Sequence, residues 1–267
     1  MSITILDNEY DINIQHLYLE KKRLRRLSVE FTIFINLQTL YLSDNQLTSL
    51  PPEIGRLINL KEIFLNWNKL NSLPAEIGNL VNLQELYLYH NDFSSLPFEI
   101  NKLLNLQILD LGSNELSSFP AEISKLINLK KLDLYTNQLT SLPAEICRLT
   151  NLQTLNLNFN QLTSLPAEFG RLINLQELNL YNNQLTSLPA EIGRLVNLKY
   201  LELRYNNLKR LPTEFGRLIN LTKLYLDKSS YEINNHNSDY EMQNINIGKN
   251  QKFNNKFTMW CKEHIFT

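Results

Sequence analysis

Few side chains in this sequence have the type and spacing that catalysis or metal binding requires. The 267-residue chain has two cysteines and four histidines. Cys261 and His264 have the C-x-x-H spacing of half a zinc site, but no second pair completes it. Cys261 as a transfer nucleophile would need an activating base, so we interpret it as an ordinary cysteine. No glycine-rich phosphate loop is present. We therefore expect neither an enzyme nor a bound cofactor or metal.

Recognition by exposed aromatic and acidic side chains is the chemistry that the sequence favours. Such residues recur at matching places in segments of 23 residues. Exposed tyrosine and tryptophan are common anchors of protein interfaces. The alternative interpretation is that aromatic residues stand here because they favour β-strands and cover one another. The candidate partner-binding residues are Tyr18, Tyr41, Phe64, Trp67, Tyr87, Tyr89, Asp110, Asp133, Tyr135, Phe159, Tyr181, Tyr205 and Tyr225.

A 23-residue repeat positions these side chains. About ten copies run from Asn13 to Asp227, and each of them opens on Asn. Counted from that Asn, positions 2, 5, 7, 12, 15, 19 and 22 are almost always Leu, Ile or Phe. A fixed period with the pattern L-x-x-L-x-L-x-x-N-x-L is the signature of a leucine-rich repeat. The candidate binding residues fall on positions 6, 8 and 9.

The first half of each repeat is expected to be a short strand. In the copy that opens at Asn151, positions 3 to 7 alternate, so Leu155 and Leu157 point inward and Asn156 points outward. Stacked copies of this strand would form a parallel sheet. Asn160 at position 10 follows the strand, where buried backbone groups need partners. Its amide can both donate and accept, so it can bridge successive turns.

The second half of each repeat is expected to be a 3-10 turn or short helix. Pro166 suits the first position of a helix, and Glu168 suits its positive end. Gly170 and Asn174 are the expected helix stops. The predicted fold class is an α/β solenoid, a leucine-rich repeat horseshoe with a parallel β-sheet on the concave face. Short 3-10 or helical segments would line its convex face.

Charge and composition argue against nucleic-acid and membrane partners. The net charge is −1, which gives no bulk attraction to anionic surfaces. Position 18 is Glu in eight copies and position 21 is basic in seven of those eight. These residues lie side by side on a helical turn and should neutralise each other on a solvated outer face. The first twenty residues have no apolar signal-peptide core. We expect a monomer in the cytoplasm.

The two ends of the chain depart from the repeat. Residues 1–12 read as a lead-in to the solenoid of residues 13–227, and residues 228–267 form an Asn-rich tail. The tail should act as a partial cap or be disordered, with its middle as loop. The first copy contains the basic run EKKRLRRL. Solvation of an open end explains that run most simply, because terminal repeats are atypical. An anion or acidic-partner patch and a localisation signal are the alternatives.

The unit L-x-x-L-x-L-x-x-N-x-L-x-x-L-P-x-E-I-x-x-L-x-N resembles the 23-residue intracellular class of leucine-rich repeats. It is similar to the repeats of Ras-suppressor, scribble and plant Ras-group-related proteins. The resemblance covers about residues 13–227 and implies a protein-binding scaffold, in some members for a small GTPase or its regulator. The Asn-rich, Lys-containing tail also looks like coding from an AT-rich genome, and the chain resembles the repeat proteins of amoebae and of the giant viruses that infect them. For a viral protein, the expected location would be the host cytoplasm.

We therefore expect a non-catalytic protein-protein interaction scaffold that binds a protein on its concave face, in signalling or in host-factor binding. Invariant framework positions beside variable outward positions support this function. The alternative is the substrate-recognition subunit of a ubiquitin ligase. Such chains usually carry an adaptor-binding segment, so the tail would have to supply that segment here.

Overall fold

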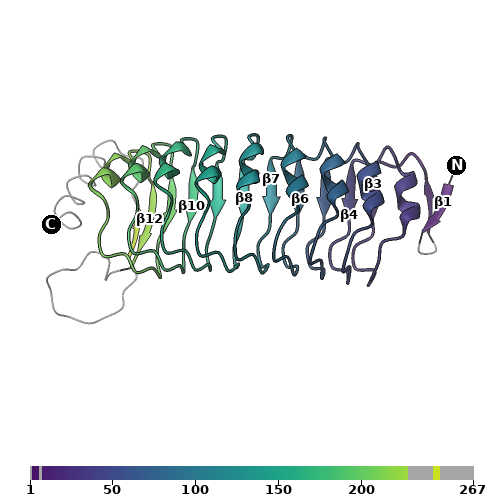
Figure 1. Ribbon diagram of the computed structural model, residues 1–267, viewed down its shortest axis with the longest axis horizontal. Helices are drawn as coiled ribbons and strands as arrows, with labels where there is room; N and C mark the ends of the chain where they lie inside the picture. The colour runs from purple at the N-terminus through teal and green to yellow at the C-terminus, as the bar shows by residue number, and fades with distance from the viewer. Residues whose placement is uncertain (1, 6–7, 228–242, 247–267) are drawn as a thin grey trace. The chain divides into compact units, whose positions relative to one another are not determined.

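The computed structural model describes residues 2–5, 8–227 and 243–246, with side chains described from residue 9 to residue 227. The chain divides into two compact units, Met1–Leu132 and Asp133–Thr267, which we call unit 1 and unit 2. In each unit, short strands follow one another in chain order and alternate with short 3-10 helices (Figure 1). The predicted class, an α/β solenoid of leucine-rich repeats, is confirmed.

The elements keep the same lengths from one repeat to the next, as their bounds show. The strands are β1 (Ser2–Ile5), β2 (Asn8–Asp11), β3 (His16–Tyr18), β4 (Thr39–Tyr41), β5 (Glu62–Phe64), β6 (Glu85–Tyr87), β7 (Ile108–Asp110), β8 (Lys131–Asp133), β9 (Thr154–Asn156), β10 (Glu177–Asn179), β11 (Tyr200–Glu202), β12 (Lys223–Leu226) and β13 (Gln243–Asn246). The 3-10 helices are η1 (Val29–Ile33), η2 (Pro52–Arg56), η3 (Ala75–Asn79), η4 (Phe98–Lys102), η5 (Ala121–Lys125), η6 (Ala144–Arg148), η7 (Ala167–Arg171), η8 (Ala190–Arg194) and η9 (Thr213–Arg217).

The strands pair in parallel with a register of one repeat. In unit 1, Leu40 pairs with Ile63 and Ile63 with Leu86. In unit 2, Leu155 pairs with Leu178 in the same way. Each of these side chains is fully buried. The register therefore places every position-5 residue in the core and every position-6 residue on the outward face of the sheet, as the alternation predicts.

The position-10 asparagines form the predicted bridge between turns. The Asn68 Nδ2 donates to the Leu42 and Leu65 carbonyl oxygens, at 3.0 Å each, and its Oδ1 accepts from the Leu47 N–H at 3.0 Å. Asn183 in unit 2 makes the equivalent bonds. One buried amide thus satisfies three backbone groups that would otherwise lack partners.

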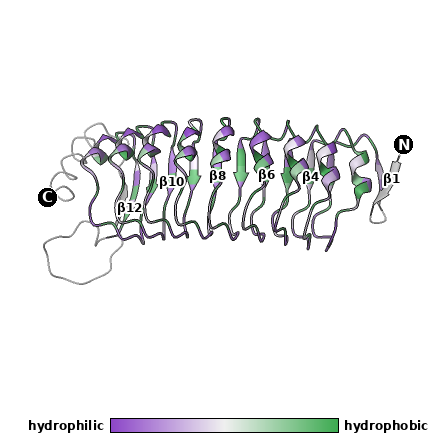
Figure 2. Cartoon of the chain, viewed as in Figure 1, coloured by the Kyte–Doolittle hydropathy of each residue, from purple (hydrophilic) through white to green (hydrophobic). Residues whose placement is uncertain are grey.

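The prolines at position 16 lie one residue earlier than predicted. Pro166 is the N-cap of η7, with φ −62° and an extended backbone, and the helix begins at Ala167. The proline ring fixes φ near this value, so the residue sets the entry to the helix without belonging to it. Each short helix carries both hydrophobic and hydrophilic residues (Figure 2), because one side of it faces the core.

The predicted helix stops at Gly170 and Asn174 are wrong. Gly170 lies inside η7, and the C-cap is Leu172. A Cβ on Gly170 would meet the backbone oxygen of Glu191 in the next turn, so glycine permits the close approach of two turns. The Asn174 Nδ2 donates to the Thr150 carbonyl oxygen at 2.8 Å. Position 1 is therefore a second asparagine bridge, at the surface.

The first and last strands show how the sheet ends. Strands β1 and β2 form an antiparallel hairpin, and the Tyr10 ring meets Phe34 of the core edge to face, 6.1 Å between ring centroids. Residues 243–246, which we expected to be loop, form β13 and pair antiparallel with β12. An unpaired strand edge exposes backbone N–H and C=O groups, and β13 satisfies those of β12. The predicted apolar cover from Tyr231, Ile233, Phe253, Phe257, Trp260 and Ile265 lies outside the described residues.

Candidate binding surface

Four of the five position-6 residues of unit 1 form a stack of parallel aromatic rings, Tyr18, Tyr41, Phe64 and Tyr87. The ring centroids lie 4.6 Å apart for Tyr18 and Tyr41, 4.8 Å for Tyr41 and Phe64, and 4.7 Å for Phe64 and Tyr87. Their planes differ by only 5–7°. These distances match the spacing of paired strands, which sets the stack. We call these four residues the aromatic stack.

The aromatic stack presents its ring edges and hydroxyl groups outward. Tyr18 is 57% exposed and the other three rings are half-buried, because each inner ring is covered on both faces. The Tyr87 hydroxyl donates to the Glu85 carboxylate at 2.7 Å. Burial and this carboxylate raise the pKa of Tyr87, and burial raises that of Tyr41. Tyr41 and Tyr87 are therefore neutral at physiological pH.

A second aromatic group of unit 1 lies just after the strands, at positions 8 and 9. The Trp67 ring centroid lies 3.9 Å from that of His90 and 5.6 Å from that of Tyr89. Trp67 and His90 have φ values of 57° and 56°, a left-handed conformation that is uncommon for bulky side chains. Trp67 is nevertheless half exposed. The turns after strands β5 and β6 thus hold large aromatic side chains at the rim of the sheet.

Unit 2 carries polar residues where unit 1 carries its aromatic stack. The Asn156 Nδ2 donates to the Asp133 carboxylate at 3.1 Å, and the Asn179 Oδ1 accepts from the Tyr181 N–H. In unit 1, the Asp110 carboxylate likewise accepts from the N–H two residues on, that of Gly112. The Asp133 carboxylate does the same for the Tyr135 N–H, at 3.0 Å, so both aspartates cap the ends of their own strands.

Four aromatic residues of unit 2 lie at positions 8 and 9, and their rings meet edge to face or tilted. The centroid distances are 5.7 Å for Tyr135 and Phe159, 5.2 Å for Phe159 and Tyr181, and 4.9 Å for Tyr181 and Tyr205. Phe159 and Tyr205 have positive φ values and are 41% and 46% exposed. These four rings form a chain along the rim of unit 2.

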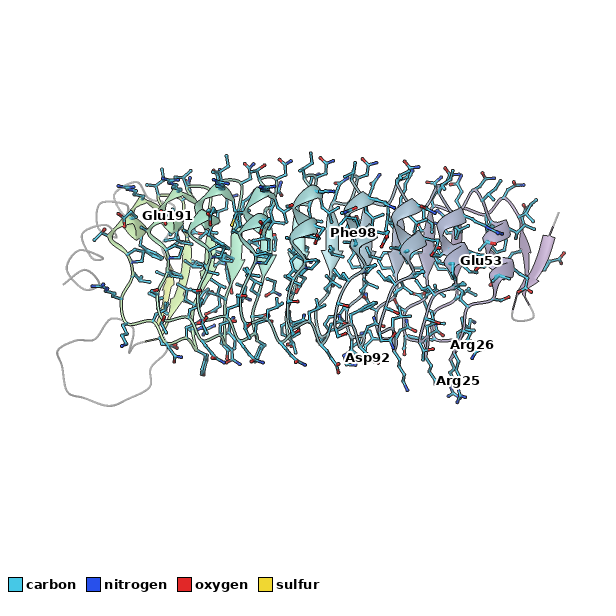
Figure 3. All side chains as sticks on the ribbon, in the orientation of Figure 1. Arg25, Arg26, Glu53, Asp92, Phe98 and Glu191 are labelled. Carbon is cyan, nitrogen blue, oxygen red and sulfur yellow. The ribbon has the colours of Figure 1, made fainter. Side chains whose placement is uncertain are left out.

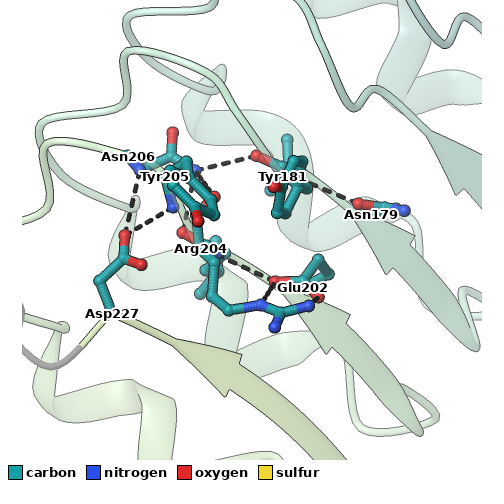
Figure 4. A network of polar contacts seen from close by, with 9 residues as sticks. Asn179, Tyr181, Glu202, Arg204, Tyr205, Asn206 and Asp227 are labelled. Atoms are coloured by element: carbon teal, nitrogen blue, oxygen red, sulfur yellow. Dashed lines mark hydrogen bonds and ion pairs between the residues drawn. The ribbon is translucent and has the colours of Figure 1, made fainter. Parts of the chain in front are cut away.

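The last turns of unit 2 contain an ion pair beneath aromatic rings (Figure 4). The Arg204 guanidinium lies 2.6 Å from the Glu202 carboxylate, which is almost fully buried. The hydrogen bond to Glu202 raises the pKa of Arg204. The guanidinium also stacks over Tyr225 at 4.9 Å. The Asp227 side chain accepts from the Tyr205 and Asn206 N–H groups, as a backbone carbonyl does in earlier turns.

The sequence matches leucine-rich repeats in three family descriptions: "Leucine rich repeat" over residues 35–93, 104–162 and 127–185, "Leucine Rich repeats (2 copies)" over 81–121, and "Leucine-rich repeat region" over 167–257. The first of these alone spans more than half of the chain. The chain belongs to the leucine-rich repeat family.

Solved structures of other leucine-rich repeat proteins share the fold. A TDR receptor is 30% identical over 78% of this chain and 38% of that chain, with a TM-score of 0.71. The matching chain of the Toll–Spatzle complex of Drosophila is 27% identical over 77% of this chain and 30% of that chain, with a TM-score of 0.69. A third structure is the ectodomain of the receptor kinase GASSHO1/SCHENGEN3 from Arabidopsis thaliana, in complex with CASPARIAN STRIP INTEGRITY FACTOR 2. It is 30% identical over 78% of this chain and 32% of that chain, with a TM-score of 0.55. The chain spans less than half of each of these receptor chains. A search of curated proteins gives no match.

The remaining chemistry-bearing residues do not form a site within the described chain. No group of three or more His, Cys, Asp or Glu side chains that could hold a metal occurs among residues 9–227. Cys147 is fully buried, and burial raises the pKa of its thiol to about 12, which leaves it unreactive. Cys261 and His264 lie outside the described residues. Among those that are described, no helix has the length and apolar character needed to cross a membrane.

The structure of this leucine-rich repeat protein shows two surface features that the sequence analysis did not predict. Position 23 carries an exposed aliphatic side chain in most turns: Ile35, Ile58, Val81, Leu104, Ile127, Ile173, Val196 and Ile219. Beside it, in unit 1, amide side chains at positions 1 and 3 and Lys61 line an open hollow of about 630 Å³. The aliphatic residues and the amide residues that line the hollow each recur every 23 residues, so the period itself was the signal. We also predicted that Glu at position 18 and the basic residue at position 21 neutralise each other on the outer face. Among the described residues, these side chains form no direct ion pair.

Proposed function

We propose that this leucine-rich repeat protein is a non-catalytic scaffold that binds a protein partner on the outward face of the unit 1 strands. The observation that carries the proposal is the aromatic stack, four aligned rings at a variable outward position of a repeat whose framework positions hardly vary. Aromatic side chains contribute large contact areas at a small cost in conformational entropy, which suits an interface anchor.

The named complexes support a protein ligand. The Toll structure is of a complex with Spatzle, and the GASSHO1/SCHENGEN3 structure contains CASPARIAN STRIP INTEGRITY FACTOR 2. Those ligands belong to those receptors. For this chain the resemblance to Ras-suppressor repeats makes a small GTPase or its regulator the first partner class to test. We place the interaction in a reducing compartment, the cytoplasm, where the unpaired Cys147 thiol is stable.

Affinity capture from the cells that make the protein, with two matched variants, tests the proposal. The first variant replaces Tyr41, Phe64 and Tyr87 by Ala. The second replaces three unit 2 aromatic residues, Tyr135, Phe159 and Tyr181, by Ala. Circular dichroism establishes that both variants are folded.

We expect the wild type and the unit 2 variant to capture the same partner, and the unit 1 variant to lose it. Loss of a few buried aromatic anchors commonly costs ~2 kcal/mol or more each, so the band should disappear. Equal capture by a folded unit 1 variant would reject this face. A ubiquitin ligase component in the wild-type capture would instead support the substrate-recognition alternative.

A further inference from the structure

Five basic side chains gather in the turn after strand β3. Lys21, Lys22, Arg23, Arg25 and Arg26 are all exposed, and we call residues 21–26 the basic loop. Figure 3 shows Arg25 and Arg26 extending from the edge of unit 1 at which Asp92 also lies. The whole chain has a net charge of −1, whereas this six-residue loop carries five positive charges.

The backbone of the basic loop is fixed rather than frayed. The Asn45 Oδ1 accepts from the Lys22 N–H at 3.1 Å and from the Leu24 N–H at 3.0 Å. The Lys21 N–H donates to the Ser43 carbonyl oxygen at 3.1 Å. Solvation of an open end, the simplest interpretation of the sequence, requires no such attachment. The structure instead holds the charged side chains on an ordered backbone.

The charges of the basic loop are not neutralised within the described part of the chain. None of the five residues forms an ion pair there. Basic residues at position 21 of the later turns differ, because a position-18 Glu precedes each of them by three residues on the same short helix. The basic loop lacks such a matched carboxylate row. Glu20, Asp44 and Asp92 lie in the same and the following turns, but these described carboxylates form no ion pair with the loop. Water and salt ions solvate its five positive charges in the free protein, and their combined potential attracts an anionic partner.

The position of the loop indicates the kind of anion. Tyr18, the exposed end of the aromatic stack, lies three residues before Lys21, so a partner on the stack reaches the loop directly. Nucleic-acid binding usually needs a basic track along many phosphates. Strands β5 and β6, further along unit 1, carry Glu62 and Glu85, so the positive surface does not continue beyond the loop. A short acidic peptide segment fits one six-residue loop better than a polynucleotide does.

We propose that the basic loop is an electrostatic docking site for a segment rich in Asp and Glu on the protein that binds the aromatic stack. This inference rests on the proposed function for the identity of the partner, but not for the chemistry of the loop. Exposed charges at the rim of an interface mainly raise the association rate and its salt dependence. The loop accordingly steers the partner, and the stack retains it.

Fluorescence anisotropy with a labelled octaglutamate peptide tests the loop on the full chain. One variant replaces Lys22, Arg25 and Arg26 by Gln and leaves the left-handed residues Lys21 and Arg23 unchanged. The control replaces Arg148, Arg171 and Arg194 by Gln, which removes the same charge from the outer face. A labelled octathymidylate of similar charge provides the nucleic-acid comparison. Both variants alter exposed side chains, and their unfolding curves establish that they are folded.

We expect octaglutamate to bind the wild type and the control equally. It should bind the loop variant at least ~10-fold more weakly, because that variant lacks three of the five positive charges that the peptide would contact. Raising salt from about 50 to about 200 mM should weaken binding to the wild type. Equal binding by the loop variant and the control, or tighter binding of octathymidylate, would overturn the proposal. The variant lacking Tyr41, Phe64 and Tyr87 should still bind octaglutamate, so failure of the stack and failure of the loop are separable.

Discussion

Units 1 and 2 are built on the same repeat and differ where they meet solvent. Position 5 is buried Leu or Ile in both, and position 10 is Asn with the same three hydrogen bonds. In unit 1, position 6 carries aligned aromatic rings in four of five turns, with Asp110 in the fifth. In unit 2 it is polar, as Asn156, Asn179 and Glu202 show, until Tyr225 in the last turn. The framework therefore does not determine the outward face. Two chemically distinct surfaces stand on one backbone, which is how a repeat protein separates folding from recognition.

The shared framework should respond equally to the same damage in either unit. We expect Asn68→Ala and Asn183→Ala each to lower the free energy of unfolding by about 3 kcal/mol or more, because each leaves buried backbone groups unsatisfied. Chemical denaturation with urea measures both. If only one of the two substitutions destabilised the protein, the framework would not be equivalent in the two units.

The ion pair of unit 2 should be costly to break from one side. Arg204→Met would leave the Glu202 carboxylate buried without its counter-charge, and we expect a loss of about 2 kcal/mol after allowing for the partial exposure of Arg204. Adding Glu202→Leu should restore most of that loss, because a buried pair contributes little against apolar residues of similar size. A double variant as unstable as Arg204→Met would show that the pair itself stabilises unit 2.

The aromatic stack should contribute to stability as well as to binding. Phe64→Ala removes a ring stacked on both faces, and we expect a loss of about 2 kcal/mol, since each aromatic pair contributes about 1 kcal/mol. Asn179→Ala at the same position of unit 2 should cost less than about 0.5 kcal/mol. Thermal unfolding of the two variants compares them. Equal losses of stability would mean that the position-6 side chain stabilises the fold in both units.

Position 20 offers a smaller, stabilising test. Asn101 stands where most turns have Gly, and its Nδ2 is buried without a hydrogen-bond partner in the described chain. We expect Asn101→Ala to raise the free energy of unfolding by about 1 kcal/mol, because it removes an unsatisfied donor. Gly193→Ala is the contrast, since its Cβ would collide with the Glu214 backbone, and it should destabilise. Stabilisation by both would refute the role given to glycine here.

Much of the repeat framework could be predicted from the sequence, because the residues that determine it recur every 23 positions. The inward leucines follow from the alternation of each strand. The bridging asparagines at position 10 follow from the need of buried backbone groups for hydrogen bonds, and the 3-10 helices follow from the placement of proline. The role of Gly170 could not be predicted, because it depends on the distance to the next turn, which no single repeat encodes. The pairing of β13 with β12 depends on an edge left open 20 residues earlier. Positions 6, 8 and 9 were identified as outward, but the change from stacked rings to a buried ion pair depends on neighbours across strands.

The central claim is that the outward rings of unit 1 meet the partner. Hydroxyl-radical footprinting of the protein, free and bound to its captured partner, tests this claim most directly. We expect Tyr18, Tyr41, Phe64 and Tyr87 to be protected from oxidation in the complex, and Tyr135, Phe159 and Tyr181 to react as they do in the free protein. Protection confined to the unit 2 rings, with the aromatic stack as reactive as before, would contradict it.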